Sequence, residues 1–99
     1  MYYTIHAELI EYKDNLGGYV DYVFKDLETH LYLVCTKLPN WQLDNIKLGD
    51  KGFVVFKEVE AGKSTWFDSK LGINNMYNYD GIYLMNFIKE QSKIDKIFI

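Results

Sequence analysis

Apolar and polar residues alternate from the start of the chain, with one change of phase. Apolar side chains occupy the odd positions from Tyr3 to Leu9 and then the even positions Ile10 and Tyr12. Alternation with a period of two predicts a strand, and a shift by one residue within it predicts a β-bulge that bends the strand. We therefore expect a long, kinked first strand.

The next two strands are expected over residues 19–27 and 31–38. The first follows the turn-forming segment 14–18, rich in Asp, Asn and Gly, so it pairs with the opening strand as an antiparallel hairpin. A second turn falls at 26–29. The third strand is nearly all apolar, as expected for a strand that is covered on both faces or lies in a barrel wall, and Pro39 ends it because proline has no N–H for the ladder.

The second half of the chain predicts two more strands separated by a long loop. Gly49 and Gly52 flank Asp50 and indicate a sharp turn into a fourth strand over 52–59. Residues 60–79 follow no period, and long connections of this kind are typically functional. The run 82–90 is interpreted as a fifth strand in preference to a short helix.

The chain is expected to hold one β-barrel domain over residues 1–91. Its 99 residues, 48% of them hydrophobic, suffice for a single core. Residues 92–99 are expected to be a tail or one helical turn, because Ser92 and Asp95 have capping-box spacing. This tail carries Ile94, Ile97 and Phe98.

The strand order resembles the OB-fold. The elements that carry this resemblance are the bent first strand, which serves both sheets of such a barrel, the three-stranded meander, and IKLGDKGFVVF at residues 46–56. The resemblance implies an all-β fold: a five-stranded antiparallel barrel with a long loop between strands four and five. The pattern departs from the common form in having no clear helix between strands three and four. An SH3-like barrel is the alternative.

Four segments also resemble small proteins of bacterial viruses. They are PNWQ, LGDKGF, EVEAGKSTWFD and YNYDGIYL. This resemblance implies a phage protein located in the cytoplasm of the host cell.

The charged residues restrict the partners. All eleven basic residues are Lys, and without Arg the chain lacks the planar fork used to read guanine and to clamp phosphates, although an AT-rich coding bias would give the same composition. The net charge is −3. Residues 8–28 carry six acids against two lysines, or −4, whereas residues 37–70 carry six lysines against five acids, or +1.

The expected location is cytoplasmic. Cys35 is alone, so it forms no internal disulfide and is expected to act as a small core residue. No apolar stretch approaches the roughly 20 residues of a membrane helix, and the opening residues lack the features of a secretion signal. We expect no membrane contact.

The sequence contains no pattern typical of an enzyme. His6 and His30 stand apart, the HExxH and CxxC spacings are absent, and LGDKG precedes a strand and so provides no helix N-terminus for a phosphate. We expect neither catalysis, nor a metal, nor a cofactor.

The loops instead combine aromatic residues with lysines. Bases of single-stranded nucleic acid stack on such rings while lysines follow the phosphates. The candidate binding residues for nucleic acid or a partner are Trp41, Lys47, Lys51, Lys63, Trp66, Phe67, Tyr77 and Tyr79. Alternatively, Trp41 and Trp66 fold back to plug the barrel ends. The competing function is assembly, in which exposed aromatic residues bury against a protein partner or another copy.

Overall fold

The computed structural model describes residues 1–39, 46–60, 66–79 and 81–90. In these ranges, the strands are β1 (Tyr2–Asp14), β2 (Val20–Asp26), β3 (Tyr32–Lys37), β4 (Lys51–Glu58) and β5 (Ile82–Lys89). Short helical turns occur at η1 (Leu16–Gly18), α1 (Asp68–Leu71) and η2 (Ile73–Asn75).

The strands form a closed barrel in the order β1-β2-β3-β5-β4. All neighbouring pairs are antiparallel except β3 and β5, which run parallel and meet at the single pair Thr36–Tyr83. The expected all-β, OB-like architecture is therefore confirmed. The expectation of a wholly antiparallel barrel is wrong at this one seam.

The bend in β1 lies where the alternation changes phase. Its pairing with β2 shifts register between Leu9 and Glu11. The N-terminal part pairs with β4 from Tyr2 to Glu8, and the C-terminal part pairs with β2 from Ala7 to Asp14. The bulge thus lets one strand serve both sides of the barrel, as the sequence predicted.

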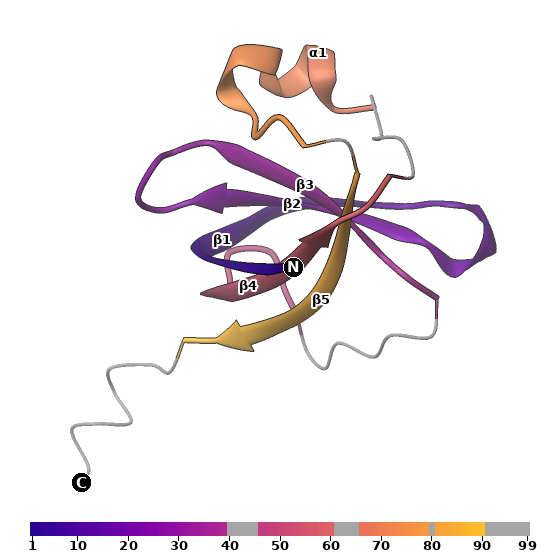
Figure 1. The fold of residues 1–99 in the computed structure, drawn as a ribbon, viewed down its shortest axis with the longest axis horizontal. Coiled ribbons are helices and arrows are strands. Elements are labelled where there is room, and N and C mark those ends of the chain that lie inside the picture. Colours follow the sequence, from indigo (N-terminus) through magenta and orange to yellow (C-terminus); the bar gives the residue numbers. More distant parts are fainter. Residues whose placement is uncertain (40–45, 61–65, 80, 91–99) are drawn as a thin grey trace, which may run out of the picture.

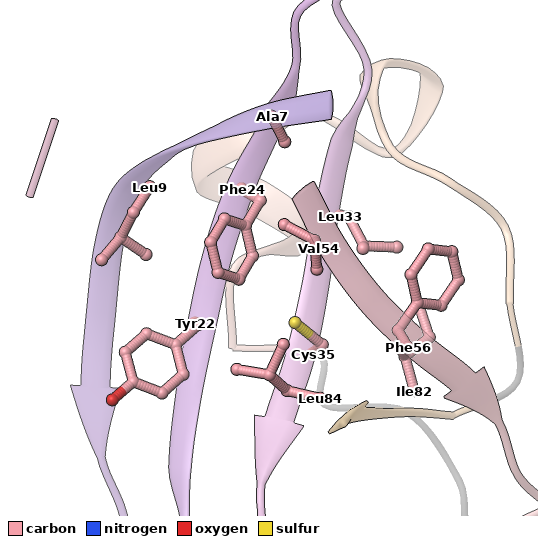
Figure 2. Packing of buried hydrophobic residues seen from close by; sticks show 10 residues of the cluster. All are labelled: Ala7, Leu9, Tyr22, Phe24, Leu33, Cys35, Val54, Phe56, Ile82 and Leu84. Atoms are coloured by element: carbon pink, nitrogen blue, oxygen red, sulfur yellow. The ribbon is translucent and has the colours of Figure 1, made fainter. Parts of the chain in front are cut away.

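All five strands contribute side chains to the core (Figure 2). Its buried members are Ala7, Leu9, Tyr22, Phe24, Leu33, Cys35, Val54, Phe56, Ile82 and Leu84. Cys35 is fully buried, which confirms its expected core position, and burial raises the pKa of its thiol well above the ordinary value. Residues 82–89 are a strand, so the preference for a strand over a helix is also confirmed.

Two features of the second half differ from expectation. Residues 66–79 contain α1 and η2, so part of the presumed loop forms short helical turns.

The two glycines expected at the turn into β4 have different roles. Gly49 takes a left-handed turn conformation, with φ of 90°, whereas Gly52 is required because of a close contact between strands. A Cβ atom at Gly52 would lie 2.2 Å from the backbone oxygen of Ile88, so β5 approaches too closely for any side chain. The expected tail at 92–99 and the segment 40–45 lie outside the described residues.

Candidate functional site

A strap of chain covers the outer face of β2 and β3. We use "strap" for residues 66–79, which include α1 and lie above these strands in Figure 1. Tyr22 and Phe24 point into the core, so Val23 between them points outward, yet Val23 and Phe67 are both fully buried. The Tyr77 N–H also donates to the Tyr32 carbonyl at 2.9 Å. The strap therefore packs on the outside of the barrel as a second, smaller apolar layer.

One end of the strap is held beside the β1–β2 turn. The Trp66 side chain is 64% exposed, and the Lys13 ammonium lies 4.5 Å from its ring centroid. Lys13 donates to Asn15 at 2.8 Å, and Asn15 donates to Asp21 at 2.8 Å. The Thr36 hydroxyl satisfies the other oxygen of Asp21 at 2.7 Å. This chain of contacts joins the β1–β2 turn to the β4–β5 connection. It also gives both oxygens of the buried Asp21 carboxylate a hydrogen-bond donor.

A second lysine–aromatic pair lies on the same outer face. The Lys25 ammonium is 6.0 Å from the Tyr32 ring centroid, at the limit for a cation–π contact. Lys70 of α1 forms an ion pair with Glu11 of β1. Acidic residues are close to each of these cations, because Glu8 pairs with Lys25 across the β1–β2 ladder. The face is therefore rich in lysine but nearly neutral.

The other end of the strap is held by Tyr77. Its hydroxyl donates to Asp26 and lies 3.0 Å from the Thr29 hydroxyl. Asp26 also accepts the backbone N–H groups of Glu28 at 2.8 Å and of Thr29 at 3.2 Å. Burial alone would raise the pKa of Asp26, but these hydrogen bonds outweigh burial and lower it. Burial and the Asp26 contact raise the pKa of Tyr77.

Tyr79 packs into the core with other aromatic rings. Its centroid lies 5.8 Å from Tyr3, 5.7 Å from Phe56 and 5.9 Å from Tyr77. Burial raises the pKa of its hydroxyl, with a smaller contribution from Tyr3. Tyr77 and Tyr79 thus stabilise the strap and the barrel in this structure.

Lys51 lies away from Trp66, and Lys47 lines a hollow against the inner side of the β1–β2 hairpin, with Tyr12 and Tyr22. Asp50 between them accepts the Lys47 N–H at 2.8 Å and forms an ion pair with Lys89 at 3.2 Å. Burial would raise the pKa of Asp50, but the Lys47 N–H and Lys89 lower it. Lys51 pairs with Glu8 of β1, whereas Trp66 lies over Lys13, five residues or about 16 Å further along that strand.

The six candidate binding residues that the structure describes therefore do not form one groove. Trp41 and Lys63 lie outside the described residues, Phe67 is a fully buried residue of the strap, and the remaining five fall into the three places described above. For Trp66, the alternative of a barrel plug is wrong, since most of its surface is exposed. Sequence reasoning missed Lys13 and Lys25 as neighbours of the aromatic residues. The alternation alone would place both on the outer face.

Two hollows border the strands. The first, about 60 Å³, lies between the strap and β3–β5, with Thr36, Tyr83 and Met76 among its lining residues, and has room for about two water molecules. The second, about 300 Å³, lies between the β1–β2 hairpin and residues 46–48.

The described residues contain no group of three or more His, Cys, Asp or Glu side chains placed to hold a metal ion. Across those same ranges, no helix is long and apolar enough to cross a membrane.

The fold places the chain among small OB-like β-barrels. Comparison with protein-family models, curated proteins and solved structures finds no match.

Proposed function

We propose that this protein is a non-catalytic binding module that takes single-stranded nucleic acid on the part of the outer face of β1, β2 and β3 that the strap leaves open, beginning at Trp66 beside the β1–β2 turn. One observation carries the proposal: Trp66, 64% exposed on the β4–β5 connection, lies over Lys13 beside the β1–β2 turn. OB-fold barrels bind oligonucleotides with the connections that correspond to these two.

The chemistry of this face suits binding without sequence preference. A base stacks on the exposed side of Trp66, which is worth about 1–3 kcal/mol, and Lys13 holds the ring from its other side. The Lys25–Tyr32 pair offers a second such position on the same face. Lysine neutralises phosphates as a point charge and requires no fixed base geometry.

The neighbouring acids limit affinity. Lys70 is paired with Glu11, and Glu8 adjoins Lys25 in the β1–β2 ladder. Few phosphates are neutralised on such a face, so binding is weak and its salt dependence shallow.

The test is a titration of fluorescently labelled oligo-dT at low salt, followed by anisotropy. We expect Trp66→Ala to weaken binding by about 5- to 100-fold, which corresponds to one lost stacking contact. The matched control is Ile73→Ala, because Ile73 is 67% exposed on the same strap. The proposal is wrong if the wild-type protein does not bind, or if both variants bind like it.

The second candidate function is assembly through protein contacts. A specific observation favours it: Tyr2, Phe53 and Ile88 are exposed on the other side of the barrel, away from the strap.

A further inference from the structure

The outer face of β1, β4 and β5 is open around Tyr2, Phe53 and Ile88, and the strap approaches it at Tyr83, which lines the hollow beside the strap. Alternation places every second residue of these strands outward, and the ladders set them side by side. The outward residues are Tyr2, Thr4, His6 and Glu8 of β1, Lys51, Phe53, Val55 and Lys57 of β4, and Tyr83, Asn86 and Ile88 of β5. Tyr2 is 62% exposed, Phe53 45% and Ile88 53%, whereas Val23 on the strap-covered face is fully buried.

An apolar strip crosses the middle of this face. Phe53 is directly opposite Ile88 on one side and His6 on the other. The rings of His6 and Phe53 stack, with centroids 5.0 Å apart. Exposed aromatic and aliphatic side chains on three adjacent strands are typical of the central part of a protein interface.

The two ends of the face carry opposite charge. At one end lie Glu8, Lys51 and Glu90, whose N–H donates to the Lys51 carbonyl, for a balance of −1. At the other end Lys57 lies between Tyr2 and Tyr83, for a balance of +1.

We propose that a second copy of this chain docks on this face, by a two-fold axis that lies between the two sheets and runs perpendicular to the strands. That operation reverses the strand direction, so the Lys57 end of each copy meets the Glu8 and Glu90 end of its partner. A two-fold axis parallel to the strands would bring like charges together. A face that complements itself in charge suits an identical partner better than a polyanion, which requires a positive surface.

The size of the face sets the strength of the dimer. Three strands of seven residues cover about 14 by 20 Å, which is below the footprint of a standard interface. We expect a dissociation constant of about 10–100 μM. The surface does not include Trp66, so the dimer stands or falls independently of nucleic-acid binding.

Sedimentation velocity of the full chain over about 5–500 μM tests the proposal. We expect a monomer–dimer equilibrium that Phe53→Thr weakens by about tenfold or more, since a central aromatic residue carries much of the energy of an interface. Ile73→Thr is the control, because it removes an even more exposed apolar side chain from the strap and should leave the equilibrium unchanged. A chain that stays monomeric at 500 μM, or equal loss in both variants, overturns the proposal.

Charge reversal tests the axis. Lys57→Glu makes both ends of the face negative, and Glu8→Lys makes both positive, so each variant alone should dimerise about tenfold more weakly at low salt. In an equimolar mixture the two variants complement each other, and the heterodimer should recover the affinity of the wild-type protein. Single variants that dimerise like the wild-type protein, or a mixture no tighter than either variant, overturn the perpendicular axis.

Two other occupants of the face are separated by the same measurement. If residues 91–99 covered it, a chain ending at Glu90 would dimerise while the full chain did not. If nucleic acid covered it, oligo-dT would dissociate the dimer and Phe53→Thr would weaken oligo-dT binding. Either result overturns the proposal, whereas a dimer unchanged by truncation and by oligo-dT supports it.

Discussion

At the scale of single residues, two buried carboxylates hold different elements of the fold together. Asp21 and Asp26 are both only 4% exposed, and each has hydrogen-bond donors on both of its oxygens. A buried carboxylate with paired oxygens costs little, but removing one donor leaves an unsatisfied charge. These two side chains therefore connect elements that are distant in the sequence: the β1–β2 turn with β3, and the β2–β3 turn with the strap.

The lowered pKa of Asp26 predicts that the folded protein loses stability in acid. Its folded pKa lies below the ordinary 3.8, so its contribution to the free energy of unfolding is complete above that pH and disappears as the pH falls through the folded pKa. We expect Asp26→Asn to destabilise the protein by about 1–3 kcal/mol at pH 7. The difference from the wild-type protein should shrink below about pH 3.8.

Urea unfolding of both proteins between pH 2 and 7 measures this difference. Tyr77→Phe is the companion variant, since it removes the hydroxyl donor to Asp26 and keeps the ring. A difference that stays constant across the whole range would contradict the role assigned to Asp26.

At the scale of elements, the tightest constraint is the approach of β5 to β4. The Cβ atom of an alanine at position 52 would lie 2.2 Å from the Ile88 oxygen and 2.9 Å from the Lys89 Cα. Both are backbone atoms of a paired strand, so relief requires the strands to separate.

We expect Gly52→Ala to lower the free energy of unfolding by about 3 kcal/mol or more, the upper range for overpacking. Chemical unfolding followed by circular dichroism measures the change. Thr4→Ala, at an exposed position in the neighbouring strand, is the control and should change stability by less than about 1 kcal/mol. Equal stabilities of the two variants would show that β5 can move away.

The strands could be predicted from the sequence, but the strap could not. The phase shift near Ile10 and the turn formers at 14–18 are local signals, and each strand they mark is present. The strap has no period, since Phe67 packs outside the core and Tyr77 bonds to Asp26, 51 residues earlier. Lys13 is likewise brought to Trp66 by tertiary folding alone. The sequence could therefore predict that aromatic residues and lysines form the candidate site, but not which of them lie together.

At the scale of the whole molecule, the barrel has two unlike outer faces. The one on β2 and β3 is covered by the strap, and the one on β1, β4 and β5 is exposed. Because β1 bends at its bulge, it contributes its C-terminal part to the first face and its N-terminal part to the second. The two proposed binding events thus use different parts of one strand, which overlap at Glu8.

This separation predicts that the two activities are independent. Trp66→Ala should leave the monomer–dimer equilibrium unchanged, and Phe53→Thr should leave oligo-dT affinity unchanged, each within about twofold, as expected for distant sites without shared partners. Sedimentation and anisotropy on the same preparations measure both quantities. A change in both activities from either substitution would show that the faces are coupled.

The short seam between β3 and β5 has a consequence for how the protein misassembles. A single residue pair, Thr36–Tyr83, closes the ladder there, whereas every other junction holds at least six. If the pairing between β3 and β5 breaks, the barrel opens into a curved sheet with β3 and β5 as unpaired edge strands. Unpaired margins are templates for strand exchange between molecules. Swapped oligomers formed on heating or storage should therefore arise by trading β5, and a cross-link across the seam should suppress them.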